Sequence, residues 1–365
     1  MMAIRFDPVF PTDVEGPFLM AGPCSAETRE QTLLAACQLR EHADRIRTDL
    51  FRAGIWKPRT MPGAFEGVGV AGLPWLAEAA AKTSLRPTTE VANAQHVEAC
   101  LAAGLDTFWI GARTSANPFS VQEIADALAP VAHRVSVIVK NPVNPDLKLW
   151  IGAIERIRNA GVRRIAALHR GFSSYGDSRY RNTPRWQIAI DLMQTYPELE
   201  VLCDVSHICG RRDILAETAQ KALDLNFRGL MFETHPNPDK AWSDAAQQIT
   251  PAQLAELFGG LVKRKPTADN PAFLSEMENR RCEIDEIDEE LLHLIARRMQ
   301  LVREIGALKR HNNVTVLQPE RFRLMRESLL RRGIQNELSP EFIHLMLEAI
   351  HQESINQQER VMNPR

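Results

Sequence analysis

The sequence lacks the paired cysteines of a disulfide framework or a structural zinc site. Its six cysteines are scattered and form no CxxC pair, which argues against both. No hydrophobic run approaches the length of a membrane span, and residues 1–17 have no basic start followed by an apolar segment. The formal net charge of -2 gives no general attraction to nucleic acid or to anionic lipid. We therefore expect a cytoplasmic protein with neither nucleic acid nor a membrane as a partner.

The length and composition predict more than one domain. At 365 residues, with 44% hydrophobic and 25% charged residues, the chain is an ordinary globular protein that exceeds a single common domain. Residues 263–271 are polar, include two prolines and show no hydrophobic period, so we interpret them as a linker. This places one domain at residues 1–262 and a second at 272–365.

The first domain alternates apolar runs with segments of helical spacing. The apolar runs are Phe18–Ala21, Leu50–Ile55, Pro87–Val91, Thr107–Ile110, Val135–Val139, Ile165–Leu168, Val201–Cys203 and Gly229–Phe232. Helical spacing fills most of the intervals, as in Thr28–Ala43 and Leu73–Ala81. Eight such repeats predict an α/β fold, the (β/α)₈ barrel. The alternative is an open doubly wound sheet, but no GxGxxG follows the first run.

A reactive or charged side chain follows every predicted strand. These residues are Cys24 and Ser25, Lys57 and Arg59, Glu90, Arg113, Lys140, His169 and Arg170, His207, and Glu233. Because the carboxyl ends of barrel strands share one rim, the groups would converge on a single mouth.

Four of the residues near this rim form a candidate metal site: Cys24, His207, Glu233 and Asp244. Without Cys24, the more common interpretation would be a hydrogen-bonded core histidine and two surface carboxylates. A mixed set of sulfur, nitrogen and oxygen donors suits one divalent first-row ion. We expect Mn²⁺, with Co²⁺, Fe²⁺ and Zn²⁺ as alternatives.

The other rim residues are mostly cations. They are Arg52, Lys57, Arg59, Arg113, Lys140 and Arg170, with Arg211 as a further candidate. Each alone would be an ordinary surface charge, but as a group they would repel one another without an anion, and Arg binds phosphate and carboxylate bidentately. The cluster predicts a ligand that carries phosphates and a carboxylate.

Several segments resemble the 3-deoxy-D-arabino-heptulosonate 7-phosphate (DAHP) synthase family, in its type I-beta branch. They are AGPCSAE at 21–27, FRAGIWKPRT at 51–60, WIGAR at 109–113, VKNP at 139–142, LHRGF at 168–172, DVSHICGRRD at 204–213 and FETHPNPDKAWSD at 232–244. The resemblance implies condensation of phosphoenolpyruvate with erythrose 4-phosphate. The sister 3-deoxy-D-manno-octulosonate 8-phosphate synthase differs at KPRT and is a remote alternative.

The resemblance also implies roles for individual residues. The metal ligands would be Cys24, His207, Glu233 and Asp244; Arg52, Lys57 and Lys140 would face the carboxylate of phosphoenolpyruvate, Arg113 and Arg170 its phosphate, and Arg59 and Thr60 the phosphate of the aldose. Lys57 could also move a proton. A different mechanism, a Schiff-base aldolase using Lys57 or Lys140, stays open.

The second domain is predicted to be helical. One helix covers about 273–310, and shorter ones lie near 319–332, with Pro319 in its first turn, and 340–359, with Ser339 as the N-cap. On the long helix, apolar residues recur at steps of three and four: Ile284, Ile287, Leu291, Leu294, Leu301, Ile305 and Leu308. At about 1.5 Å per residue this helix approaches 60 Å, so we expect it to pair with a second chain. Arg298 interrupts the apolar pattern, either as a second anion site or as an arginine that extends to the surface.

This region resembles the all-helical chorismate mutase family, whose short form is an intertwined dimer. The positions that match its substrate contacts are Arg281, Arg298, Lys309, Arg321, Ser354 and Gln358. Arg281 from a partner chain and Arg298 would clamp the two carboxylates of chorismate, while Lys309 and Gln358 would match charge at its ether oxygen. Gln318 and Phe322 depart from the pattern, because acidic residues commonly contact substrate there.

Together these features predict a bifunctional enzyme that forms a homodimer through the helical domain, with a tetramer as the alternative. Since no further N-terminal domain is expected, the helical domain is the candidate for feedback control by prephenate or chorismate. The alternative is a catalytically silent dimerisation and sensor module.

Overall fold

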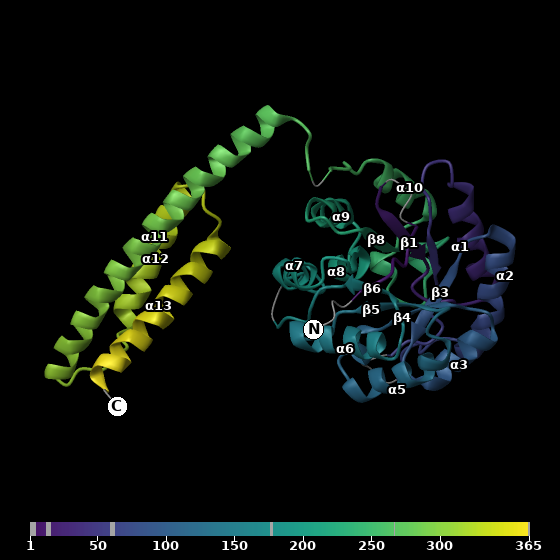
Figure 1. The fold of residues 1–365 in the computed structure, drawn as a ribbon, viewed down its shortest axis with the longest axis horizontal. Helices are drawn as coiled ribbons and strands as arrows, with labels where there is room; N and C mark the ends of the chain where they lie inside the picture. Colours follow the sequence, from purple (N-terminus) through teal and green to yellow (C-terminus); the bar gives the residue numbers. More distant parts are fainter. Residues whose placement is uncertain (1–4, 12–15, 59–62, 176–177, 266, 364–365) are drawn as a thin grey trace. The chain divides into compact units, whose positions relative to one another are not determined.

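The computed structural model describes residues 5–11, 16–58, 63–175, 178–265 and 267–363. The chain divides into two compact units between residues 266 and 267. Each unit is described by itself (Figure 1).

Unit 1 is a closed barrel of eight parallel strands in sequence order, which confirms the predicted (β/α)₈ fold. The strands are β1 (Phe18–Gly22), β2 (Leu50–Arg52), β3 (Pro87–Val91), β4 (Thr107–Ile110), β5 (Ser136–Lys140), β6 (Arg164–His169), β7 (Glu200–Asp204) and β8 (Gly229–Glu233). Nearly every strand residue is buried, as expected for parallel strands covered on both faces.

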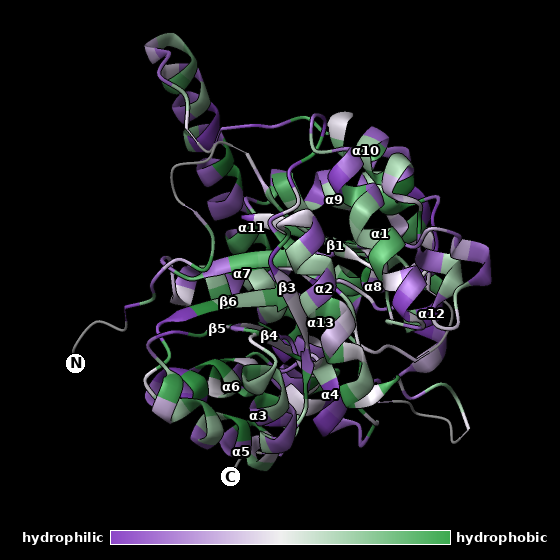
Figure 2. Ribbon diagram, turned by 90° about the vertical axis from the view of Figure 1, so that its right-hand side faces the viewer, coloured by the Kyte–Doolittle hydropathy of each residue, from purple (hydrophilic) through white to green (hydrophobic). Residues whose placement is uncertain are grey.

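Helices surround the strands and supply the outer layer of the core. They are α1 (Arg29–Glu41), α2 (Leu73–Thr83), α3 (Ala94–Ala102), α4 (Ala112–Ser115), α5 (Pro118–Leu128), α6 (Leu147–Asn159), α7 (Trp186–Thr195), α8 (Val205–Cys209), α9 (Leu215–Asp224) and α10 (Pro251–Gly259). Hydrophobic and hydrophilic bands alternate along these helices (Figure 2). A smaller apolar cluster that includes Met20, Trp109 and Leu168 forms separately from the large cluster between strands and helices.

Local sequence signals fix where several helices begin. The side chain of Thr28 accepts a hydrogen bond from the backbone N–H of Gln31, and Asp146 accepts one from Leu149. Thr250 and Gln253 form a reciprocal capping box at α10. Because these acceptors satisfy otherwise unpaired N–H groups, they set the first turn of each helix.

Closure of the barrel brings the two ends of the domain together. β1 pairs with β8 in a register that sets Gly22 opposite Glu233. Cys24 follows two residues after Gly22, so the pairing carries its thiol to the tip of β8. Cys24 and Glu233 are therefore close in space, although they are far apart in the sequence, because β1 pairs with β8.

Unit 2 contains three helices: α11 (Pro271–His311), α12 (Pro319–Gln335) and α13 (Pro340–Met362). Each has proline in its first turn, and Ser339 caps α13 by accepting a hydrogen bond from Phe342, as predicted. α11 buries only Met299, Val302 and Gly306 within this chain.

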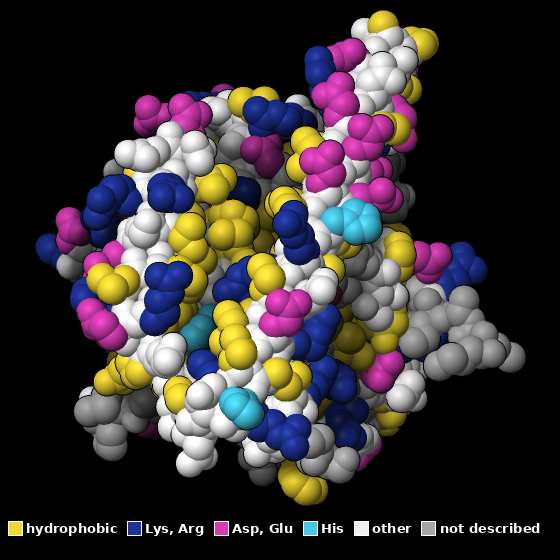
Figure 3. Space-filling view, turned by 90° about the vertical axis from the view of Figure 1, so that its left-hand side faces the viewer, with side chains coloured by type: hydrophobic (Ala, Val, Ile, Leu, Met, Phe, Trp, Pro, Cys, Tyr) yellow, Lys and Arg dark blue, Asp and Glu magenta, His cyan; other side chains and the backbone are white. Residues whose placement is uncertain are grey.

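The apolar residues predicted to form a packing seam on α11 are exposed in the single chain. Ile284 is 55% exposed and Leu294 62% exposed, and the other five are also exposed. Figure 3 shows hydrophobic side chains lying between acidic ones along this helix. Within the described residues, no helix combines the length and the hydrophobicity needed to cross a membrane.

Candidate active site

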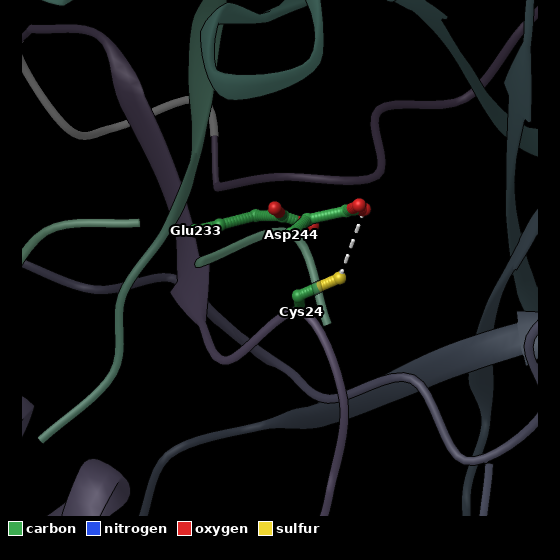
Figure 4. Close-up of side chains that lie close together, drawn as sticks. All are labelled: Cys24, Glu233 and Asp244. Carbon is green, nitrogen blue, oxygen red and sulfur yellow. Dashed lines mark hydrogen bonds between the residues drawn. The ribbon is translucent and has the colours of Figure 1, made fainter. Parts of the chain in front are cut away.

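Three of the four predicted metal ligands lie together at the carboxyl ends of the strands. One potential ligand atom from each of Cys24, Glu233 and Asp244 falls within 4.8 Å of the other two. The Sγ of Cys24 is 3.4 Å from Oδ2 of Asp244 (Figure 4). Donors that bind one first-row ion at about 2.0–2.3 Å stand at most roughly 4.6 Å apart, so these spacings are close to those of a shared cation.

The fourth predicted ligand, His207, lies at the edge of this group. Its Nε2 is 3.6 Å from Oε1 of Glu233, although it falls outside the three-residue cluster. Its Nδ1 is held by Asp204 at 2.9–3.0 Å. Since a carboxylate only accepts, it keeps the proton on Nδ1 and leaves a lone pair on Nε2. Burial lowers the pKa of His207 more than Asp204 and Glu233 raise it, which favours the neutral imidazole that a metal requires.

The Cys24 thiol is deeply buried between charged neighbours. Burial and the Glu233 carboxylate raise its pKa to about 11, although Lys57 acts in the opposite direction. The Nζ of Lys57 donates to both the Cys24 carbonyl, at 3.0 Å, and its Sγ, at 3.1 Å. A bound cation would therefore have to displace the thiol proton at neutral pH.

Glu233 is held on both carboxylate oxygens. Nη1 of Arg52 donates to Oε1 at 2.9 Å, and the amide of Gln247 donates to Oε2 at 2.6 Å. Arg52 also donates to the Cys24 carbonyl at 2.9 Å. Burial raises the pKa of Glu233, but the opposing effect of His207 and Arg52 is larger, so the net shift of this pKa is downward. The carboxylate stays ionised and fixed in orientation.

A pocket of about 90 Å³ opens beside these groups, and it is lined mainly by ionisable side chains. Its lining residues are Lys57, Pro58, Glu90, Ala112, Arg113, Lys140, Arg170, Arg181, His207 and Asp244. Four of the predicted anion-binding cations and two of the predicted metal ligands thus meet in one pocket. Such a set of cations suits a ligand with several negative charges.

Two of these cations are held in buried surroundings. Lys140 donates to Asp204 at 2.8 Å, and burial lowers the pKa of Arg170 to about 10, so that it remains a cation near neutral pH. The pKa of Asp204 is shifted down, because His207 and Lys140 outweigh the effect of burial. Asp204 thus links the candidate metal ligand to the candidate anion site.

The position of Glu90 in the pocket lining explains why residue 111, in the WIGAR segment, is glycine. A Cβ on Gly111 would lie 2.0 Å from Oε1 of Glu90. Glu90 in turn accepts a hydrogen bond from the indole of Trp109 at 3.0 Å. Only glycine allows the chain to pass this carboxylate on its way to Arg113.

Two rim predictions are wrong. His169 does not face the mouth: it is fully buried among aromatic rings, with Trp186 at 5.4 Å and Phe172 at 5.6 Å between centroids. Successive strand residues point to opposite faces, and His169 takes the outer one. Arg211 is exposed and paired with Asp213 outside the pocket. Arg59 and Thr60 lie outside the described residues.

Sequence reasoning missed three residues of the site: Arg181, Asp204 and Gln247. Arg181 lines the pocket from the loop before α7, where no periodic pattern draws attention to it. Gln247 lies in the short η4 turn (Ala245–Gln247) just after Asp244. Asp204 could have been found, because it ends an apolar strand and precedes His207 by three residues.

In unit 2, Arg298 and Ser354 form the best-defined contact among the predicted positions. Nη1 of Arg298 donates to Oγ of Ser354 at 2.6 Å. Gln358 is buried one turn further along α13, and its Oε1 has no hydrogen-bond partner among the described residues. Lys309 donates to the carbonyl of Val316.

The remaining mutase positions are exposed in the single chain. Arg281 is ion-paired with Glu278 at 3.6 Å, and Arg321 lies on the surface of α12. Phe322 stacks on His351 at 3.7 Å between centroids, and Gln318 precedes α12 as an exposed residue. The two departures from the resemblance thus have different surroundings, one packed and one open.

Comparisons with known proteins divide the chain at the same place as its structure. Residues 13–265 match the model of the DAHP synthetase I family, and residues 280–359 match that of chorismate mutase type II. The phospho-2-dehydro-3-deoxyheptonate aldolase of Thermotoga maritima is 31% identical over 252 residues, covering 69% of this chain and 70% of that protein. A 2-dehydro-3-deoxyphosphooctonate aldolase of Bradyrhizobium sp. (strain BTAi1) is 28% identical, covering 70% and 88%.

Two solved structures of DAHP synthases are also similar to this chain. The crystal structure of phospho-2-dehydro-3-deoxyheptonate aldolase (DAHP synthase) from Thermotoga maritima superposes with a TM-score of 0.58 at 28% identity, covering 66% of each chain. The truncated form of 3-deoxy-D-arabino-heptulosonate 7-phosphate synthase from the same organism gives 0.57 at 27% identity, covering 69% of this chain and 89% of that one. The structural match thus spans just under two thirds of the first of these two Thermotoga maritima chains.

Proposed function

This chain belongs to the DAHP synthetase I family, and we propose that its barrel condenses phosphoenolpyruvate with erythrose 4-phosphate while its helical unit converts chorismate to prephenate. A synthase domain followed by a mutase domain supports a bifunctional enzyme of the shikimate pathway. The octulosonate synthase alternative is weaker, because KPRT at 57–60 follows the DAHP synthase pattern.

One observation carries the proposal for the barrel. Cys24, Glu233 and Asp244 come within 4.8 Å of one another beside a pocket lined by Lys57, Arg113, Lys140 and Arg170. A site for one divalent ion next to a site for a polyanion is what the condensation requires, because an aldehyde must be activated close to a bound enol phosphate.

We propose that Cys24, His207, Glu233 and Asp244 hold the ion, which when bound supplies Lewis acidity to the aldehyde carbonyl. Mn²⁺ is our first choice, since the carboxylate donors suit it and the single imidazole and thiolate do not exclude it. Co²⁺, Fe²⁺ and Zn²⁺ would fit the same donors.

The cations of the pocket would hold phosphoenolpyruvate. Of the cations that line the pocket, Arg113 and Arg170 would face its phosphate, and Lys57 and Lys140 its carboxylate. Arg52 does not line the pocket but lies buried against Glu233, and its proposed role is also at the carboxylate. The charge of these cations compensates the anionic groups as water adds at C2, and their fixed positions align the enol carbon with the aldehyde. Lys57, beside the thiol, is placed to hold or transfer a proton. Arg59 and Thr60 keep their proposed role at the aldose phosphate.

For the helical unit, we propose a chorismate site around Arg298, Lys309, Ser354 and Gln358, with Arg321 as a further contact. Rearrangement of chorismate is intramolecular, so it needs a compact conformer and matched charge rather than a general base. The Arg298–Ser354 hydrogen bond fixes one cation, and Gln358 is buried one turn beyond Ser354 on α13.

A second copy of this chain is needed to complete that site. Arg281 lies 17 residues before Arg298 on the same helix, which places it roughly 25 Å away along the axis. We propose that the exposed apolar residues of α11 pack against a partner, which brings the partner's α11 and its arginine to the site. The unit would then be an intertwined dimer, and tetramers could form by further pairing.

We also propose that prephenate or chorismate binding to this unit restrains the synthase. The other possibility is that unit 2 is only a dimerisation and sensor module, which the stacking of Phe322 on His351 and the exposure of Gln318 favour, since neither supplies an acidic contact. Direct assay of chorismate disappearance distinguishes the two.

A metal-stripped and reconstituted synthase assay, run beside a chorismate assay on the same protein, tests the whole proposal. We expect condensation to depend on added divalent metal and chorismate turnover to be independent of it. Condensation that proceeds fully without metal would refute the barrel mechanism, and absence of chorismate turnover would leave the sensor role.

A further inference from the structure

We propose that Arg181 and Asn182 act as a positioning pair that fixes the phosphate-binding side of the barrel site relative to its metal-binding side. The inference rests on the proposed synthase function and assigns roles to two residues that neither the sequence motifs nor the comparisons single out. Both residues lie between Phe172 and α7: Asn182 contacts Arg170 and the backbone of His207, and Arg181 contacts Asp244.

Asn182 connects the phosphate side to the histidine segment. Its Oδ1 accepts a hydrogen bond from Nη1 of Arg170 at 2.7 Å, and its Nδ2 donates to the carbonyl of His207 at 2.6 Å. Because an arginine only donates and a carbonyl only accepts, these partners permit a single orientation of the amide. Asn182 is buried, so both contacts are shielded from water.

Arg181 connects to the carboxylates of the metal side. Nη1 donates to Oε1 of Gln247 at 2.7 Å and lies 3.2 Å from Oδ1 of Asp244. The same Gln247 donates through Nε2 to Glu233 at 2.6 Å. One guanidinium thus fixes Asp244 directly and Glu233 through one amide, while the second oxygen of Asp244 faces the Cys24 thiol.

The backbone around the pair is built to hold it in place. Phe172 donates to the carbonyl of Thr183 at 2.9 Å, and the backbone N–H groups of Arg181 and Asn182 donate to the carbonyls at the end of α8, the helix that carries His207. A Cβ on Gly210, at φ +67°, would lie 2.4 Å from Cβ of Arg181. The end of α8 therefore packs directly against this arginine.

These contacts have a specific consequence for metal binding. Asp244 has a left-handed backbone, at φ +49°, which a non-glycine residue keeps only when its surroundings hold it. Loss of Arg181 would release the Asp244 carboxylate and, through Gln247, loosen Glu233. Removal of partners that orient metal ligands typically weakens metal binding by about 10- to 100-fold.

The test uses the full-length protein and Co²⁺ as the probe. Arg181→Ala, Arg181→Lys and Asn182→Ala are compared with wild type by calorimetric titration of the metal-stripped protein and by the absorption spectrum of the Co²⁺-loaded form. KM for phosphoenolpyruvate and kcat are measured in parallel. Arg179→Ala is the matched control, since Arg179 lies two residues away and pairs with Glu217 on the surface.

We expect Arg181→Ala to weaken Co²⁺ binding by about 10- to 100-fold and to alter the Co²⁺ spectrum. Arg181→Lys should recover part of the affinity, because an ammonium can still pair with Asp244. Asn182→Ala should instead raise KM through Arg170, and Arg179→Ala should change nothing.

Unchanged Co²⁺ affinity and spectrum in Arg181→Ala would overturn the inference, as would a rise in KM alone. Because Arg181 is 45% exposed, its replacement leaves the core intact, so this result stands even if Asn182→Ala fails to fold. Failure of the wild-type protein to bind Co²⁺ would instead refute the proposed metal site, so the two failures are distinguishable.

Discussion

The ammonium of Lys57 lies 3.1 Å from the thiol sulfur of Cys24, although the two residues follow different strands of the barrel. Burial lowers the pKa of Lys57, but Cys24 and Glu233 oppose this, and the net shift is upward, so the side chain stays cationic. A cation at this distance stabilises the thiolate that a metal would bind. The contact therefore couples the proposed metal site to the proposed phosphoenolpyruvate site.

Cys24→Ala should abolish the condensation and leave chorismate turnover intact. The variant removes the sulfur donor and the anion beside Lys57, so metal affinity should fall by at least about 10-fold and kcat with it. Metal content after dialysis and both enzyme assays provide the measurement. Since the replaced side chain belongs to unit 1 alone, loss of both activities would indicate misfolding, and retention of the condensation would contradict a metal role for Cys24.

Removal of metal distinguishes the proposed chemistry from a Schiff-base aldolase. In EDTA we expect condensation to stop and to return on addition of Mn²⁺ or Co²⁺. Borohydride reduction with substrate present should leave Lys57 and Lys140 unmodified, as judged by mass spectrometry, because neither amine is proposed to attack a carbonyl. Activity that survives EDTA together with a reduced adduct on either lysine would support the alternative.

The barrel and most of its site could be predicted because the relevant signals are local. Pro87–Val91 and Thr107–Ile110 were predicted with the observed bounds, since each is a short apolar run between polar turns. Once eight parallel strands are recognised, the rim follows from topology, which placed Cys24 beside Glu233.

The site residues that were predicted wrongly or missed are those whose side-chain orientation depends on tertiary packing. His169 and Arg170 are adjacent at the end of β6, but only Arg170 lines the pocket, and the end of a strand does not reveal which face the histidine takes. Arg181 and Gln247 lie in irregular segments, where only tertiary contacts show their partners. The predicted seam on α11 is a different case: it is exposed in the single chain, as expected of a surface proposed to pack against a second copy.

The buried His169 should make the barrel sensitive to acid. Burial lowers the pKa of His169 to about 3, against an ordinary value near 6.5. Between these two pH values, His169 binds a proton in the unfolded chain but not in the folded protein. Stability from this residue is therefore complete above about pH 6.5 and is lost as the pH falls toward 3, by up to about 1.4 kcal/mol per pH unit.

His169→Phe should reduce this sensitivity, because phenylalanine fills a similar volume among the same rings and does not titrate. Urea midpoints of full-length protein, followed by tryptophan fluorescence at about pH 7.5 and pH 5, provide the measurement. His133→Phe, at an exposed position, is the control. An equal loss of stability on acidification in His169→Phe and wild type would show that other groups cause it.

Arg281 and Arg298 should complement each other between chains. Their separation of roughly 25 Å along one continuous helix prevents them from sharing a site within a chain. Arg281→Ala and Arg298→Ala should each lack chorismate turnover, since one carboxylate clamp is lost from every site. In a mixed dimer, however, one of the two sites receives both arginines intact and the other receives neither.

Equal amounts of the two variants, allowed to exchange subunits, should therefore recover about one quarter of wild-type mutase activity, because half of the dimers are mixed and half of their sites are complete. Arg280→Ala, at a neighbouring residue whose side chain pairs with Glu276 and Glu283 on the same helix, is the matched control and should stay active without mixing. Failure of the mixture to regain activity, with subunit exchange verified by differently tagged chains, would rule out a site shared between two copies of α11. Activity of Arg281→Ala alone would show that the site is complete within one chain.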